Sequence, residues 1–568
     1  MKRARICRVC FQLTLFALPL LLAARLSADA GDPPARVARL SFIKGTVSLQ
    51  PSGAKDWSQA SLNYPLSTGD RIYTDQDSQA ELEVGSAAVR ASATTDLTIA
   101  NLNDQLMQLG LGQGTLRVRV YDLPEGDSIE VDTPNGALTL LLPGDYRVET
   151  FPDDNTTLVV VNSGSLEVTG GAVSERVESG QAAKLTGTDP IQVSLVSLPA
   201  GDDFDQWCWE RDRRIASATS TSYVSRETPG YYDLDNYGVW DEHTPLGPVW
   251  YPAGVPVGWV PYRFGRWVWV FPWGWTWVES EPWGFAPFHY GRWALIGARW
   301  GWLPGPVVVR PYYAPALVVF VGGANFSVGV GSFQAWFPLG PGEPYYPWYH
   351  YGGNYLRQVN VTNIRNVTNI TNITNITNVT NIHYVNKSTA VTVVPTSAFG
   401  SGQRVDRHTI AVTREQAARA EVIPHPETNP TARALGGGRP ASAPPALATR
   451  PRIAPTGEGR PPVAAPNAPT GGGVASGPLP TPPRFVTRKP APPPSVPFSE
   501  QQKAMQSHPG RPIEPQQQDN LRAGKPAGPM QDREFPPHPA PAPRPERPQP
   551  TPKPESRPAA PSGAGPKH

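Results

Sequence analysis

Residues 264–277 read FGRWVWVFPWGWTW, and this stretch decides how the middle of the chain folds. Every second residue from Trp267 to Trp277 is aromatic, so an extended backbone places these rings on one face of a sheet. Pro272 indicates an edge or a kink, because proline cannot donate to a strand ladder. Gly274 lies between two tryptophans and leaves space on the opposite face. The pattern predicts β-strands with stacked aromatic side chains.

The aromatic pattern repeats within residues 231–302. Twelve of the 17 tryptophans lie between Trp240 and Trp302, and an aromatic-Gly-x-Trp motif occurs there three times. The glycines of the three motifs are Gly238, Gly265 and Gly291. A repeat of about 26 residues is long enough for one β-hairpin. We therefore expect an aromatic-repeat β module over residues 231–350, stabilised by ring pairs and not by disulfides.

Residues 36–190 predict a second β domain. Segments such as TVSLQ, AELEV, TLRVRV and SLEVT alternate apolar and polar residues, with turns about every 8–12 residues. This spacing predicts a sandwich or roll, so the fold class is all-β. Residues 191–230 form a linker, in which WCWERDRR predicts a short helix or strap.

Motifs spread over residues 36–190 make this region similar to FecR domains. They are FIKGTVSLQ, LSTGDRIYT, AELEVG, GTLRVRV, VDTPNG, GDYRV and NSGSLEV. The resemblance implies a periplasmic β fold that contacts protein or ligand. It does not extend to sigma-factor control, because only about ten residues precede the apolar N-terminal run, which leaves no cytoplasmic domain. The region from Tyr231 to about Phe399 resembles an exported family of unknown function with YxWGxW-like repeats, which implies export but no activity.

Residues 1–30 have the features of a secretory signal peptide. Four basic residues precede the apolar run FQLTLFALPLLLAA, and a small-x-small pattern ends at Ala30. We expect cleavage after Ala30, with an uncleaved anchor as the alternative. No transmembrane helix is then expected, because glycines and Asn325 interrupt the apolar residues 314–330. The expected location is the periplasm, the cell surface or the medium.

The C-terminal residues 401–568 predict a disordered, proline-rich tail. Of the 68 prolines, 39 follow residue 420, and this part carries a net charge of +8. Such a composition buries too little apolar surface to offset chain entropy. The folded middle is acidic, at about −10, and a nucleic-acid-binding core usually shows the reverse charge. Nucleic acid is therefore not an expected partner.

Residues 351–400 complete the aromatic module and contain an unusual tract. From residue 360 to residue 382 the chain runs in aliphatic-Thr-Asn triplets. Period three fits neither a strand nor an α-helix, so a threefold extended helix, a solenoid edge and a solvated linker all remain open. An uncharged, Asn-rich and β-prone tract of this kind also suggests self-association.

Eight tryptophans are the candidate ligand-stacking residues. They are Trp267, Trp269, Trp273, Trp275, Trp277, Trp293, Trp300 and Trp302. Exposed indole faces stack on sugar rings much as they stack on bases. The first interpretation of these rings is nevertheless a buried core of aromatic ladders, and the alternatives to it are this stacking platform and an aromatic belt at a membrane interface.

No catalytic, metal-binding or cofactor-binding residue is predicted. Residues 241–243, Asp-Glu-His, are consecutive and fit a solvated turn. Glu279 and Glu281 have the spacing of paired carboxylates in glycoside hydrolysis, but ESEP is more typical of a turn between hairpins. His289 lies among aromatic residues, Cys208 has no histidine partner, and the histidines lack metal-ligand spacing.

These patterns together predict an exported, non-catalytic cell-envelope protein. Its contacts with protein or polysaccharide would be made by the FecR-like domain and the aromatic module. The alternatives are an enzyme that acts on cell-wall glycan and a self-assembling surface or matrix protein.

Overall fold

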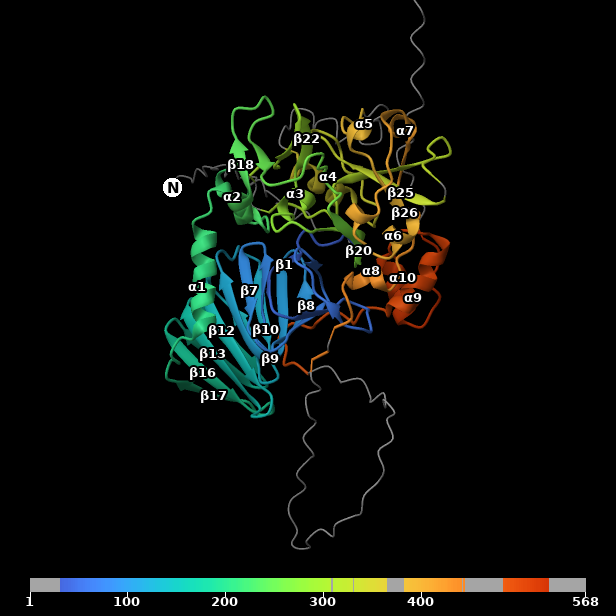
Figure 1. Cartoon of the computed structure of the whole chain (residues 1–568). Coiled ribbons are helices and arrows are strands. Elements are labelled where there is room, and N and C mark those ends of the chain that lie inside the picture. The colour runs from blue at the N-terminus through green and yellow to red at the C-terminus, as the bar shows by residue number, and fades with distance from the viewer. Residues whose placement is uncertain are drawn as a thin grey trace, which may run out of the picture.

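The computed structural model describes residues 31–307, 310–329, 331–364, 383–441, 443–444 and 484–530. Strands dominate this part of the chain and form several sheets, which confirms the predicted all-β class. Figure 1 shows the N-terminal β domain below the tryptophan-rich module, with the C-terminal helices beside both. The predicted signal peptide lies outside the described residues.

The N-terminal domain consists of two nine-stranded sheets that share strand β9 (Leu106–Val120). In order across sheet A, the strands are β4 (Pro65–Leu66), β1 (Ala38–Lys44), β6 (Gln79–Val84), β7 (Ala87–Ala91), β9, β12 (Gly144–Phe151), β13 (Thr156–Ser163), β16 (Gln181–Thr186) and β17 (Gln192–Val196). In order across sheet B, they are β3 (Ser58–Gln59), β2 (Val47–Gln50), β5 (Arg71–Thr74), β8 (Asp96–Leu102), β9, β10 (Ser128–Asp132), β11 (Ala137–Leu140), β14 (Ser165–Gly170) and β15 (Val173–Glu178).

Strand β9 crosses from one sheet to the other at Gly114. Residues 106–113 pair within sheet B, and residues 114–120 pair within sheet A. Gly114 has φ +88°, and a Cβ there would lie 2.6 Å from the Cα of Thr95. Only glycine fits this crossing point, because it tolerates a positive φ and occupies no side-chain space.

The aromatic module contains the three expected hairpins. They are β18 (Gly238–Asp241) with β19 (Val249–Pro252), β20 (Gly265–Val270) with β21 (Gly274–Glu279), and β22 (Arg292–Ile296) with β23 (Arg299–Leu303). Pairing of β19 with β23 joins the first and third hairpins into one four-stranded sheet. The second hairpin stands as its own two-stranded sheet.

A further four-stranded sheet and several short helices complete this part of the structure. Its strands, in order, are β26 (Thr392–Pro395), β25 (Phe333–Pro338), β24 (Val318–Gly322) and β27 (Glu421–Ile423). The helices are α1 (Asp203–Ala216), α2 (Leu234–Tyr237), α3 (Ala286–His289), α4 (Gly353–Val361), α5 (Lys387–Ala390), α6 (Thr396–Gly400), α7 (Arg414–Arg419), α8 (Arg433–Gly436), α9 (Phe498–Ala504) and α10 (Pro515–Arg522). Single 3₁₀ turns cover Ser220–Ser222, Tyr231–Asp233, Val405–Arg407 and Met505–Ser507.

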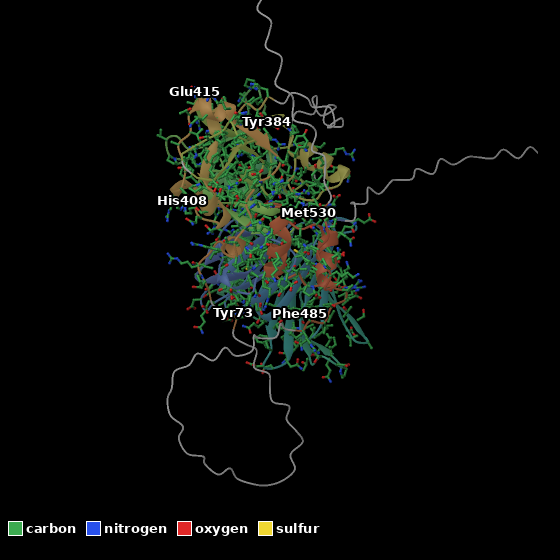
Figure 2. All side chains as sticks on the ribbon, turned by 90° about the vertical axis from the view of Figure 1, so that its right-hand side faces the viewer. Tyr73, Tyr384, His408, Glu415, Phe485 and Met530 are labelled. Atoms are coloured by element: carbon green, nitrogen blue, oxygen red, sulfur yellow. The ribbon has the colours of Figure 1, made fainter. Side chains whose placement is uncertain are left out.

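The predicted disorder of residues 401–568 is wrong for residues 401–441 and 484–530, which pack on the folded body. Strand β27 belongs to the predicted tail and pairs with β24. Figure 2 shows Phe485 toward the β-domain end of the molecule and Met530 nearer its middle. The rest of the predicted tail lies outside the described residues.

A few large apolar side chains explain why these proline-rich segments are ordered. The buried ones beyond residue 484 are Val496, Phe498, Met505, Ile513 and Met530. The N–H of Phe498 donates to the carbonyl of Gly53 at 3.0 Å, and the indole N–H of Trp275 donates to the carbonyl of Thr428 at 2.9 Å. Because these partners are distant in sequence, the average composition of the tail did not reveal them.

Most of the triplet tract, residues 365–382, lies outside the described residues. Its first two residues belong to α4, so the tract begins at the end of a helix. None of the helices in the described ranges combines the length and the apolar character that a membrane crossing needs.

Candidate functional site

The eight candidate ligand-stacking tryptophans lie inside the protein. Their exposed fractions run from 0% to 9%, with Trp300 the most exposed. Trp267 and Trp277 are cross-strand partners with ring centroids 5.5 Å apart, and Trp269 and Trp275 are partners at 5.4 Å. A covered ring has no free face for a sugar, so burial contradicts a stacking role for these eight residues. They belong to a buried aromatic core, in which the cross-strand rings Trp267–Trp277 and Trp269–Trp275 pair edge to face.

Some of the indole N–H groups fix this core to nearby backbone, whereas that of Trp267 has no hydrogen-bond partner within the described residues. Trp293 donates to the carbonyl of Pro287 and Trp302 to the carbonyl of Tyr290, each at 2.8 Å. Such an acceptor stabilises a buried indole, because an unpaired donor away from water is costly. The rings therefore have fixed positions and act as structural supports.

The carboxylates considered for glycoside chemistry do not form a cleft. Glu279 is 1% exposed and accepts hydrogen bonds from the indole N–H of Trp277 and the backbone N–H of Ser280, both at 3.0 Å. Burial raises the pKa of Glu279 to about 8. The neighbouring Glu281 uses its backbone carbonyl to accept from Asn63 at 2.7 Å. Glu279 is therefore an enclosed structural group.

The other chemical candidates are also structural or solvated. His289 is fully buried, its Nδ1 lies 2.8 Å from the carbonyl of Ala314, and burial lowers its pKa to about 3. Cys208 is 0% exposed on α1, and burial raises its pKa to about 12. Residues 241–243 are exposed beside the first hairpin. Among the described residues, no group of three His, Cys, Asp or Glu side chains could hold a metal ion.

A layer of buried charges lies between sheet A and α1. Arg90, Arg117 and Arg147 lie opposite one another on neighbouring strands and form an arginine row. Helix α1 places Asp205 and Asp212, seven residues apart, on the face that covers this row. Like charges on adjacent strands repel, so the row needs carboxylates, which come both from α1 and from sheet A itself, where Glu81, Asp145 and Glu149 pair with the row. This pairing positions α1 across the sheet, as Figure 1 shows.

The distances within this ionic layer are short. Arg90 lies 2.7 Å from Glu81 and 2.7 Å from Asp212, and Arg211 of α1 also pairs with Glu81. Arg117 pairs with Asp205. Burial alone would raise the pKa of Glu81, but Arg90 and Arg211 outweigh it and bring the pKa down to about 2. The layer is therefore charged at neutral pH, and it ties α1 to the sheet.

Arg39 joins the β domain to the aromatic module. Its guanidinium donates to Asp233 at 2.6 Å, to Asn63 at 3.0 Å and to the carbonyl of Pro282 at 2.7 Å. The side chain is 0% exposed. Since Asn63 also donates to the backbone at Glu281, the second hairpin is fixed against β1 and its neighbours.

The outer face of sheet B holds residues 484–489 of the C-terminal segment. Glu130 accepts hydrogen bonds from the backbone N–H groups of Arg488 and Lys489 at 3.0 and 3.2 Å. The amide of Gln108 donates to the carbonyl of Lys489 at 2.7 Å. The N–H of Val486 donates to the carbonyl of Thr133 at 3.0 Å. These contacts recognise main-chain groups, so this face can bind a polypeptide.

Two side-chain contacts add detail to this face. The ring of Phe485 covers Gly110, where a Cβ would lie 2.6 Å from the ring. Arg488 forms an ion pair with Glu167 that is partly exposed on both sides. Aromatic packing at one position and a cation three residues later thus accompany the main-chain hydrogen bonds.

Sequence reasoning did not find this face, because its contacts join residues more than 300 positions apart. A signal was present nonetheless. Glu130 and Asp132 put two carboxylates on one face of β10, beside Gln108 of β9. Polar residues on one face of a strand usually indicate solvent, and here they indicate a covered surface.

Comparison with known proteins gives a family match to the aromatic module. Residues 231–343 match a family described as "Family of unknown function (DUF6600)". No curated protein matches the chain. The chain is therefore a multi-sheet β protein with a module similar to a family of unknown function, and no comparison indicates an enzyme family.

Two solved structures are similar to a smaller part of the chain. Both are crystal structures of a candidate anti-sigma factor from Parabacteroides distasonis ATCC 8503, at 1.65 and 2.50 Å resolution. The identities are 16% and 17%, the TM-score is 0.20 for each, and 22% of this chain is covered. The similarity spans 60% of the length of those chains.

Proposed function

We propose that this chain is an exported, non-catalytic protein of the cell envelope that contacts other proteins. The observation that carries the proposal is the outer face of sheet B, where Gln108 and Glu130 hold the backbone of residues 486–489. A surface that pairs with peptide N–H and C=O groups is suited to a polypeptide ligand. A peptide backbone presents N–H and C=O groups in fixed alternation, and this face binds both kinds of group.

The aromatic module serves as a rigid support in this proposal. Its candidate sugar-stacking rings are covered, which favours protein over polysaccharide as the ligand. Arg39 and the ionic layer fix the module and α1 to the β domain. A stiff body of this kind presents the sheet B face in one orientation and pays little conformational entropy when a partner binds.

Export is part of the proposal and has its own test. The signal-like residues 1–30 precede Gly31, and we expect the mature chain to begin there. Mass spectrometry of the protein from the envelope fraction measures this directly. A cytoplasmic protein that retains Met1 would overturn the proposed location.

Protein binding is tested against glycan binding in the same preparation. The full mature chain is incubated with purified peptidoglycan and exopolysaccharide, and bound protein is measured by sedimentation. In parallel, intact cells are treated with a short cross-linker and adducts are mapped by mass spectrometry. We expect specific adducts with envelope proteins and no saturable sedimentation with glycan. Saturable glycan binding without protein adducts would refute the proposal.

A further inference from the structure

Residues 484–489 can leave sheet B without unfolding their neighbours. On one side only residues 490–494 separate them from Ser495, whose hydroxyl lies 2.5 Å from that of Ser52. On the other side residues 445–483 connect them to residue 444. Helices α9 and α10 are therefore attached independently of the segment. A short element between two separate attachments can open by itself.

The segment is held less firmly than the helices that follow it. Phe485 and Val486 are half-buried and Arg488 is exposed, whereas Phe498 is 6% exposed and Met505 is 0% exposed. The Arg488–Glu167 pair is partly solvated, and exposed ion pairs contribute little. The contacts of the segment are thus suited to reversible binding.

The site also has polar capacity that the segment leaves unused. Gln108 Oε1 is buried and accepts no hydrogen bond within the described residues, and Glu130 Oε2 and Asp132 Oδ1 accept none from the segment. Burial and the hydrogen bond with Glu130 raise the pKa of Asp132 to about 9, so these two carboxyl groups share a proton at neutral pH. All three side chains are 0% exposed. A buried acceptor without a donor, as at Gln108 Oε1, is rare and calls for an explanation. A ligand that presents a donor to Gln108 Oε1, and a cation in place of the proton that Glu130 and Asp132 share, would satisfy the site better than the segment does.

We infer that the outer face of sheet B is a binding site for a polypeptide segment of another protein, and that residues 484–489 occupy it as an internal competitor. The ligand has an aromatic residue over Gly110, a basic residue three positions later beside Glu167, and a side-chain donor toward the Glu130–Asp132 pair. This inference rests on the proposed function and names its site. It also makes that site self-inhibited.

A different protein is the expected partner, and not a second copy of this chain. An exchanged segment from a second copy would make the same contacts as the chain's own segment and gain nothing. It would also lose the high local concentration that the covalent connection within one chain provides. A foreign segment that satisfies the unused acceptors does gain contacts.

The test uses a fluorescein-labelled peptide that spans residues 484–494 and the full mature chain. Binding is measured by fluorescence anisotropy. In the wild type the internal segment competes, so binding is weak. The double substitution Phe485→Ala with Arg488→Ala in the chain frees the site, and the apparent Kd then falls about tenfold or more, because affinity scales with the open fraction. Equal affinity in both chains would overturn the inference.

Two further substitutions in the freed chain locate the site. Gly110→Val fills the space that the phenyl ring of Phe485 needs, and we expect loss of peptide binding. Gly353→Val is the matched control, since a Cβ at Gly353 meets nothing within 4 Å. Thermal unfolding of each variant checks that it folds. Peptide binding that survives Gly110→Val would place the site elsewhere and refute the assignment.

A charge exchange keeps the test decisive if Gly110→Val does not fold. Glu167→Lys on the partly exposed β14 should weaken the peptide about two- to fivefold, the range of an exposed ion pair. A peptide with Arg488→Glu should regain that affinity on the Glu167→Lys chain and lose it on the parent. Failure of the exchange argues against this binding geometry.

Two further measurements distinguish binding of another protein from self-association, and failure of this site from failure of the proposed function. Sedimentation velocity of the wild type should show a monomer, and a dimer that disappears with Phe485→Ala would assign the site to a second copy and overturn the choice of partner. Cellular cross-linking is repeated with Gly110→Val. If Gly110→Val no longer binds the peptide but still gives the same protein adducts in cells, the partners bind elsewhere on the chain. That result would refute this site and leave the proposed function intact.

Discussion

The ionic layer under α1 gives the sharpest stability prediction. Replacing Glu81 by alanine leaves Arg90 and Arg211 without their shared carboxylate. Arg90 and Glu81 are both 0% exposed, so water cannot take over this role. Removing one partner of a buried pair costs about 3–5 kcal/mol. The pKa of Glu81, about 2 compared with 4.5 for an ordinary glutamate, gives an independent value of about 3 kcal/mol.

The assay is urea unfolding of the full mature chain at pH 7, followed by circular dichroism and tryptophan fluorescence. We expect Glu81→Ala to lower the free energy of unfolding by about 3–5 kcal/mol. Glu178→Ala is the matched control on β15, because its side chain is 53% exposed and its pair with Arg176 is loose at 3.9 Å. This control should change stability by less than about 0.5 kcal/mol.

The pH dependence of the stability loss in Glu81→Ala tests the assigned role of Glu81. A carboxyl group with a depressed folded pKa stabilises the protein above its unfolded pKa, and this contribution disappears as the pH falls toward the folded value. The difference in free energy of unfolding between wild type and Glu81→Ala should therefore be largest at pH 7 and should decrease as the pH falls from about 4.5 toward 2. A gap that is the same at pH 7 and pH 3, or a variant as stable as Glu178→Ala, would refute the assigned role.

Three further predictions concern the interior of the molecule. Trp275→Ala should lower the free energy of unfolding, measured by urea titration, by about 3–5 kcal/mol. Trp209→Ala, at a site 43% exposed, should lower it far less, and equal losses in the two variants would contradict the buried aromatic core. Glu279 has a raised pKa of about 8, so it destabilises the folded protein increasingly as the pH rises from about 4.5 to 8. Glu279→Gln should therefore gain stability relative to wild type over that range, and a difference in melting temperature that does not change with pH would contradict the burial of Glu279. Cys208 should resist thiol reagents in the native chain and react in urea, and rapid native labelling measured by mass spectrometry would show that α1 does not stay packed on the β domain.

The aromatic hairpins are the part of the fold that the sequence predicts best. Two-residue periodicity, a glycine at or just before the first strand of each hairpin, and a repeat of fixed length are local signals, and they specify strands and turns without reference to distant residues. The observed pairs Trp267–Trp277 and Trp269–Trp275 follow from this pattern. The run turns at residues 271–273, so the aligned rings lie on two antiparallel strands and not on one continuous strand.

Such local signals could not predict the buried charges. Glu81, Arg90 and Arg117 occupy the polar positions of alternating strands, which normally face solvent. Only the seven-residue spacing of Asp205 and Asp212 on α1 hinted at a matching charged face. The same holds for sheet B, whose polar outer face is covered by residues 484–489.

The sequence by itself determined the strands, the three hairpins and the all-β class, because these depend on periodicity and backbone preferences within a few residues. The tertiary structure alone decided which faces are covered, and hence that the tryptophans are core, that the arginine row is neutralised by carboxylates of α1 and sheet A, and that residues 484–489 of the C-terminal region lie on sheet B. The physical reason is that alternation defines two faces of a strand but not what packs on them. Burial arises from contacts between residues far apart in the chain, and no local pattern encodes those.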